Sequence, residues 1–216
     1  MRLSTTTYYV DFAVYPALFT GLVAHGLAPA GLASAATFLI MLVFGVGLWT
    51  FIEYLVHRFL FHHAPVLQDL HDAHHAEPHD LIGSPIWTSL PIALVILAGS
   101  VWLLGSDAGG GLSAGLVAGY VWYISVHHLS HHGRLYGMRY LYRARRRHAL
   151  HHACETGNFG VSTDFWDRVF GTVLLSAAAN GGAPDNRGAW WTTGRIGRLW
   201  GRKPWGALVR LSRPRV

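Results

Sequence analysis

The sequence predicts an all-α membrane protein with about four transmembrane helices arranged as two hairpins. Hydrophobic residues make up 51% of the 216 residues and charged residues 13%, about half the charged share of a soluble domain. The mean hydropathy is +0.28, and two long stretches are almost free of charge. The length suffices for one domain, so we expect a single integral-membrane domain over residues 1–216.

The first uncharged stretch, residues 12–52, contains no Asp, Glu, Lys or Arg. A helix that crosses a bilayer needs about 20 apolar residues, so this stretch predicts two spans, at 12–26 and 32–54. Between them lies the segment G-L-A-P-A-G, which begins at Gly26 and has the glycine and proline typical of a turn.

The second stretch, residues 81–126, is interrupted only by Asp107. It predicts spans at 86–104 and 110–127, with the segment G-S-D-A-G-G-G from Gly105 as the turn. A hairpin returns to the side from which it started. The N-terminus and residues 57–80 and 127–216 should therefore face the same compartment.

The arginines predict which compartment this is. The two outer turns carry no Lys or Arg, whereas the inner segments carry Arg58, Arg134, Arg139, Arg143, Arg145, Arg146 and Arg147. The positive-inside rule puts that side, with both termini, in the cytoplasm. Basic residues can also indicate nucleic-acid binding, but no motif of that kind accompanies them, and we expect no nucleic-acid partner.

Histidines are concentrated on the same side, with 14 of the 15 in residues 57–79 and 127–152. Residues at i, i+3 and i+4 share one face of a helix. Two triplets have this spacing, one at His71, His74 and His75 and one at His148, His151 and His152. Between them, spacing alone allows either the pair His127 and His131 or the triplet His128, His131 and His132.

Imidazole is a good ligand for iron, zinc, copper and nickel. Because no single ion takes eight or more nitrogens, three clusters on one membrane face predict a dimetal site in a cytosolic histidine-rich cap. His57 and His62 add an i, i+5 pair. That pair requires a distorted helix, or a helix that ends between the two residues.

Other uses of histidine fit less well. A metal-storage tract would be contiguous and low in complexity, and a transporter would place its histidines inside the spans. The Glu-x-x-His pairs of soluble di-iron carboxylate proteins are absent. A membrane metal-handling protein remains an open alternative.

Three motifs resemble the membrane fatty acid hydroxylase / sterol desaturase superfamily. They are E-Y-L-V-H-R-F-L-F-H (53–62), G-Y-V-W-Y-I-S-V-H-H-L-S-H-H-G (119–133), and H-A-L-H-H (148–152) followed by N-F-G-V-S-T-D-F-W-D-R-V-F-G-T (158–172). The resemblance covers about residues 45–175 and is closest to the fatty acid 2-hydroxylase branch.

The resemblance implies a di-iron, O2-dependent monooxygenase that hydroxylates a lipid drawn from the bilayer, with zinc possible in a purified form. By motif the metal ligands would be His57, His62, His71, His74, His75, His127, His131, His148, His151 and His152. We expect 2-hydroxylation of a fatty acyl chain, with a carotenoid or sterol hydroxylase or desaturase as the alternative.

The chain departs from the family pattern at some points. Ile124 stands where the 2-hydroxylases often have Asp, so a contact to a ligand is in doubt there. The sequence has no room for a fused cytochrome b5 domain. We therefore expect a separate electron donor, such as a ferredoxin, a cytochrome b5 or a reductase.

Some residues outside the motif histidines have two interpretations. Glu53 would either orient a histidine N–H or pair with Arg58. Asp164 and Asp167 are expected to be structural, near a helix capped by Ser162 or Thr163. The tail, residues 181–216, should lie on the membrane surface or be disordered.

Overall fold

The computed structural model describes residues 2–28, 31–134 and 137–175. Within these ranges every regular element is a helix and there is no strand, which confirms the expected all-α class. The predicted behaviour of the tail, 181–216, lies outside the described residues.

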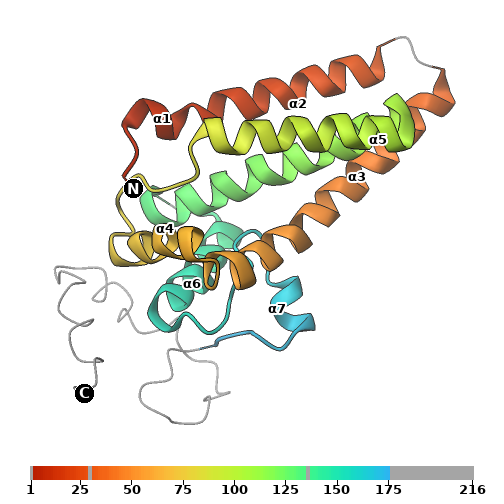
Figure 1. Ribbon diagram of the computed structural model, residues 1–216. Helices are drawn as coiled ribbons and strands as arrows, with labels where there is room; N and C mark the ends of the chain where they lie inside the picture. The colour runs from red at the N-terminus through yellow and green to blue at the C-terminus, as the bar shows by residue number, and fades with distance from the viewer. Residues whose placement is uncertain (1, 29–30, 135–136, 176–216) are drawn as a thin grey trace, which may run out of the picture.

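The long helices lie side by side, and the shorter helices gather at one end of them (Figure 1). The long ones are α2 (Asp11–Leu27), α3 (Leu32–Leu55) and α5 (Ile86–His132). The shorter ones are α1 (Thr5–Tyr9), η1 (Val56–Phe61), α4 (Pro65–Ala76), α6 (Arg139–Cys154) and α7 (Phe165–Val169).

Three helical stretches are long and apolar enough to cross a membrane: Thr5–Leu27, Leu32–Phe61 and Ile86–His132. The first begins seven residues before the predicted start at 12. Val10 has helical dihedral angles (φ −60°, ψ −33°) and joins α1 to α2 without a break. The first helix therefore carries Asp11, which lies outside the predicted span because it ends the uncharged stretch.

The 47 residues of α5 form two arms that fold back on each other at Gly105. Gly105 has φ +81°, a conformation that glycine adopts without steric cost. Beyond it, Ser113 Oγ lies 2.7 Å from Ser100 Oγ, although a straight helix would separate them by about 20 Å. The predicted turn is thus present, but it is a single residue instead of a loop.

Small residues let α3 approach the second arm of α5 closely. A Cβ atom at Gly115 would lie 2.1 Å from the Leu42 carbonyl oxygen, and one at Gly111 would lie 2.3 Å from that of Phe38. Close backbone contact at small residues is typical of membrane helix pairs. Large apolar side chains instead face outwards, such as Trp102, which is 83% exposed.

The N-terminal segment is fastened to the loop that precedes α5. The Leu3 N–H donates to the Leu81 carbonyl at 2.9 Å, and Arg2 pairs with Asp80 at 2.9 Å. This end of the chain therefore lies beside α4, at the end of the bundle where the short helices gather (Figure 1).

Candidate metal centre

The i, i+5 pair of His57 and His62 lies in a distorted helix, which is one of the two arrangements that its spacing allowed. Residues 56–61 form the π-helix η1, which follows α3 directly. The wider turn stacks the His57 and His62 rings, with centroids 5.5 Å apart and an interplanar angle of 20°. Both imidazoles thus face α4 and α6.

Five histidines from η1, α4 and α6 converge into one group, the five-histidine group: His57, His62, His71, His75 and His151. Each offers one ring nitrogen, and these nitrogens all lie within 4.8 Å of one another. The Nε2 atoms of His57 and His71 are 3.1 Å apart, and the Nε2 atom of His75 is 3.0 Å from that of His71. His151 Nε2 lies 3.1 Å from His75 Nε2.

A second group, the four-histidine group, draws on α4, α5 and α6: His74, His131, His148 and His152. The His131 and His148 Nε2 atoms are 2.8 Å apart, and those of His148 and His152 are 3.1 Å apart. His127 lies beside this group, with its Nε2 atom 3.0 Å from His74 Nε2.

The remaining five histidines lie outside both groups. His25, His63 and His79 are exposed. His128 instead lies with its Nδ1 atom 3.1 Å from the Tyr8 hydroxyl, and its ring stacks on that of His132. On α5 it is therefore the pair His127 and His131 that faces the other clusters, while the triplet that spacing alone also allowed is split.

The donor atoms of both groups fit metal ions. Burial, together with the neighbouring histidines, lowers the pKa of the imidazoles on α4 and α6, to about 4 for His75 and about 3 for His151. The rings are therefore neutral at pH 7, as ligands must be. A metal–nitrogen distance of about 2.1 Å places adjacent ligands ~3 Å apart, which matches the Nε2 separations. All-nitrogen sets suit iron or zinc.

Two imidazoles of the five-histidine group are anchored by backbone carbonyls. His57 Nδ1 contacts the Phe159 carbonyl oxygen, and His151 Nδ1 lies 2.9 Å from that of Gly157. An Nδ1–H that donates to a carbonyl leaves Nε2 with its lone pair for a metal and fixes the ring orientation. His75 Nδ1 also lies 3.4 Å from a Glu155 carboxylate oxygen.

Two buried carboxylates hold the loop that provides these carbonyls, which we call the anchor loop (157–163). Asp167 accepts hydrogen bonds from the Phe159 and Gly160 N–H groups at 2.9 and 2.8 Å. Glu53 accepts from Val161 N–H at 2.7 Å, from Ser162 N–H at 2.8 Å and from the Ser162 hydroxyl.

Asn158 fastens the same loop to residues beyond it. Its side-chain amide donates to the Leu174 carbonyl at 3.0 Å and accepts from the Leu174 N–H at 2.8 Å. Its own backbone has φ +56°, a region in which Asn is enriched. Asn158 and Glu53 each begin one of the motifs quoted above, but nothing in their local sequence indicates that they hold this loop.

Both interpretations of Glu53 were therefore wrong. It contacts backbone N–H groups and not a histidine, and Arg58 donates to the Tyr54 hydroxyl at 2.7 Å. The structural expectation for the two aspartates agrees with their contacts, since Asp164 pairs with Arg168 at 2.7 Å. Neither predicted residue is the N-cap of α7: that position is Asp164, without a side-chain cap hydrogen bond, and the Thr163 hydroxyl accepts from the Phe165 N–H at 3.2 Å.

The four-histidine group has no comparable anchors among the described residues. The Nδ1 atoms of all four rings are buried and lack a hydrogen-bond partner there. Packing against neighbouring rings, such as the contact of His75 and His152 at 4.1 Å between centroids, is what orients these imidazoles.

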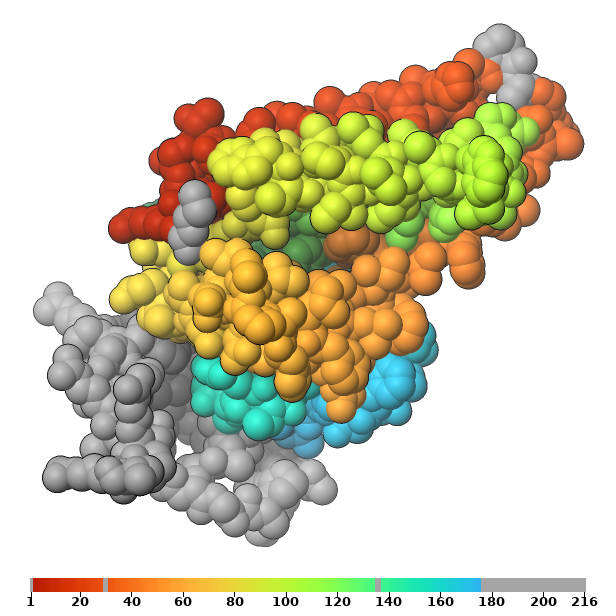
Figure 2. Space-filling model, viewed as in Figure 1, coloured from red at the N-terminus to blue at the C-terminus, as the bar shows by residue number. Residues whose placement is uncertain are grey.

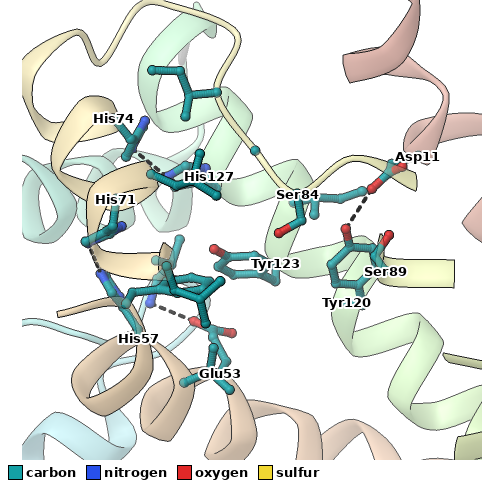
Figure 3. A pocket seen from close by; sticks show the side chains of 18 of the residues that line it. Asp11, Glu53, His57, His71, His74, Ser84, Ser89, Tyr120, Tyr123 and His127 are labelled. Carbon is teal, nitrogen blue, oxygen red and sulfur yellow. Dashed lines mark hydrogen bonds between the residues drawn. The ribbon is translucent and has the colours of Figure 1, made fainter. Parts of the chain in front are cut away.

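A cavity of about 210 Å³ adjoins both groups. His57, His71, His74 and His127 lie on one side of it, and Asp11, Ser84, Ser89 and Tyr120 lie on the other, with Tyr123 between (Figure 3). The rest of the wall is mostly apolar and includes Val56, Phe61, Leu67, Leu70 and Ile124. Ile124, which stands where the 2-hydroxylases often have Asp, therefore adds an apolar side chain to the wall and no carboxylate. The surface is hollowed between the first arm of α5 and α4 (Figure 2).

Comparison with known proteins gives relatives with the same motifs. The family model "Fatty acid hydroxylase" matches residues 42–172. Human fatty acid 2-hydroxylase is 36% identical over 146 residues, which cover 62% of this chain and 39% of the relative. A dihydroceramide fatty acyl 2-hydroxylase of Arabidopsis thaliana is 34% identical over 65% of this chain and 63% of its own length.

A solved structure described as full-length scs7p, with only the hydroxylase domain visible, has the same fold. Its TM-score is 0.66 at 28% identity, and the match covers 80% of this chain and 68% of that one. The chain spans about two fifths of the length of the mammalian relatives it matches. The family model nevertheless covers more than half of the chain and includes every histidine of both groups. The chain therefore belongs to the fatty acid hydroxylase family.

Proposed function

We propose that this protein is a membrane-bound lipid hydroxylase that adds a hydroxyl group at the 2-position of a fatty acyl chain. The observation that carries the proposal is the convergence of ten histidines beside an apolar cavity. Relatives named fatty acid 2-hydroxylase and dihydroceramide fatty acyl 2-hydroxylase support the choice of position and substrate.

The ten histidines would hold two metal ions, which we propose to be iron. The five-histidine group would hold one, and the four-histidine group together with His127 would hold the other. When bound, two irons supply the chemistry that hydroxylation of an unactivated C–H bond requires, with O2 as oxidant and electrons from a separate donor.

The protein's own task is to position the acyl chain and to exclude water. Phe61, Leu67 and Leu70 line the cavity next to the imidazoles, and an apolar wall of this kind holds a methylene chain without competing polar contacts. A fixed approach of the C2 carbon to the histidine groups gives the orientation on which selectivity depends. The anchored rings of His57 and His151 keep that geometry constant.

The metal groups and both termini would face the cytoplasm. The arginines of the inner segments support this orientation, and they would also attract anionic lipid headgroups and an acidic electron-donor protein. Two of them also bind the protein itself: Arg145 donates to the Gly133 carbonyl at 3.1 Å and Arg146 to that of Leu175 at 3.2 Å. A ferredoxin, a cytochrome b5 or a reductase would supply the electrons.

Mass spectrometry of hydrolysed lipids tests the proposal. Cells that express the protein should gain 2-hydroxy fatty acids, and cells that express His151→Ala should not. His63→Ala is the matched control, because His63 is exposed and lies outside both groups. Oxidised carotenoids or sterols in place of hydroxy acids would favour the alternative substrates. Loose, exchangeable binding of many metals without turnover would favour a metal-handling protein.

A further inference from the structure

Asp11 places a buried carboxylate in the cavity, on the side opposite the histidines (Figure 3). The residue is 6% exposed. One carboxylate oxygen, Oδ2, accepts a hydrogen bond from the Tyr120 hydroxyl at 2.7 Å. The other, Oδ1, is buried and has no hydrogen-bond partner among the described residues. A buried acceptor without a donor is costly, so this oxygen is suited to a donor on a ligand.

The second acid of the cavity differs from the first. Glu53 also lines the wall, but both of its oxygens accept hydrogen bonds from the anchor loop. Of the two carboxylates, only that of Asp11 retains an oxygen for a ligand.

The Asp11 carboxylate is held in a fixed position. Tyr120, its partner, packs edge-on against Tyr15 and Trp49 with ring centroids 4.5 and 5.4 Å away. A group positioned in this way gives up little conformational entropy when a ligand binds.

The charge of the cavity restricts the ligand. No Lys or Arg is among the described residues that line it. On the Asp11 side of the cavity, the carboxylate of a free fatty acid would therefore meet Asp11 without a basic side chain to compensate, since the metal ions proposed above would lie at the histidines on the other side. Like charges in a poorly solvated site repel strongly. An uncharged head group with a hydroxyl or amide N–H would instead supply the donor that Oδ1 lacks, and Ser84 and Ser89 lie on the same side of the cavity (Figure 3).

We propose that Asp11 is the acceptor of a head-group subsite that selects lipids with an uncharged, donor-bearing head over free fatty acids. The proposal rests on the proposed function, because it places the acyl carbons next to the head at the histidine groups. The subsite would determine which acyl lipid is hydroxylated, while the histidines determine the chemistry.

The test uses the full-length, metal-loaded protein in lipid nanodiscs with a reductant. Three probes share one acyl chain: an N-acyl amino alcohol, its O-methylated form with a tertiary amide, and the free fatty acid. Binding of each tritiated probe is measured beside turnover. The wild type should bind the amino alcohol at least tenfold more tightly than either of the other two. Equal binding of all three, or preference for the free acid, would overturn the proposal.

Asp11→Asn tests the role of the Asp11 carboxylate itself. Asn can keep an acceptor towards Tyr120 and present its NH2 group where Oδ1 was, so a donor-bearing head should bind at least tenfold less tightly and the free acid more tightly. Asp107→Asn, at the far end of the bundle beside the Gly105 turn, is the control. An equal loss for all three probes at unchanged metal content would contradict a head-group role. If Asp11→Asn does not fold, the wild-type comparison of hydroxyl and O-methyl heads decides.

The binding measurement separates this proposal from the proposed function. A wild-type protein that binds the amino alcohol selectively but oxidises no acyl chain would contradict the hydroxylase assignment and leave the subsite supported. A protein that hydroxylates the acyl chains but binds all three probes equally would contradict the head-group subsite and leave the hydroxylase assignment supported.

Discussion

The two histidine groups have the same kind of ligand but differ in what orients it. In the five-histidine group, the rings of His57 and His151 donate from Nδ1 to carbonyls of the anchor loop. In the four-histidine group, none of the four Nδ1 atoms has a partner among the described residues. Mutating a residue that hydrogen-bonds the other ring nitrogen of a metal-binding histidine typically changes metal affinity 10–100-fold. The spacing of histidines therefore determines which rings converge, and the anchor loop determines which of them are held.

The largest expected effect is that of His151→Ala. The substitution removes a ligand of the five-histidine group together with its contact to Gly157. We expect hydroxylation to fall by more than about 100-fold and metal content to fall by one ion per chain, measured by elemental mass spectrometry. His148→Ala should remove the other ion. Loss of both ions from either variant would show that the two groups do not bind independently.

Removing metal from the intact protein with a chelator tests whether the two histidine groups hold metal differently. The metal of the four-histidine group should leave about 10–100 times faster than that of the five-histidine group. Release into a chromogenic chelator should therefore have two phases of equal amplitude. A single phase would mean that anchoring by carbonyls makes no difference to retention.

Asp167→Asn should reduce the difference in metal-release rate between the two histidine groups. An amide in place of the carboxylate presents an NH2 group to one of the backbone donors, Phe159 N–H or Gly160 N–H, and should lower the free energy of unfolding by about 1–3 kcal/mol. The slow phase of metal release should accelerate by about tenfold while the fast phase stays unchanged. Asp164→Asn, three residues earlier and paired with the exposed Arg168, is the control and should leave both phases as they are.

The smallest effect is expected for Thr172→Val. It deletes the hydroxyl that donates to Asp167 at 2.7 Å but keeps both backbone contacts of that carboxylate to the anchor loop. We expect a loss of about 1 kcal/mol in the free energy of unfolding, from denaturant titration, and an acceleration of the slow phase of only a few-fold. An effect as large as that of Asp167→Asn would mean that Thr172, and not the carboxylate, holds the loop.

The sequence predicts the features that depend on local pattern. Uncharged stretches located the long helices and Gly105 marked the turn. The spacing of His57 and His62 predicted either a helix end or a distorted helix, and η1 is the second of these. Gathering the histidines at one end of the bundle followed from the hairpins. Which compartment that end faces remains a prediction.

Contacts between distant segments had no such pattern. Glu53 contacts Val161 and Ser162, more than 100 residues later, and a carboxylate that accepts from backbone N–H groups has no signature in sequence. Asp11 was placed outside the first span because a charged residue ends an apolar stretch. Its burial depends on the Tyr120 hydroxyl, 109 residues away. Both carboxylates became interpretable only once the tertiary structure brought their partners to them.

The π-helix η1 also limits which changes of sequence length this segment can tolerate. Each residue added to or removed from a helix rotates everything beyond it by about 100° and shifts it by about 1.5 Å. A deletion between His57 and His62 would leave an i, i+4 pair, which an ordinary helical turn also places on one face. An insertion would exceed even the wider turn of η1 and rotate His62 away from His57. Phe59 and Leu60 are half-exposed, so these positions can accept other residues. In an alignment of related sequences, this stretch should show substitutions but no insertions.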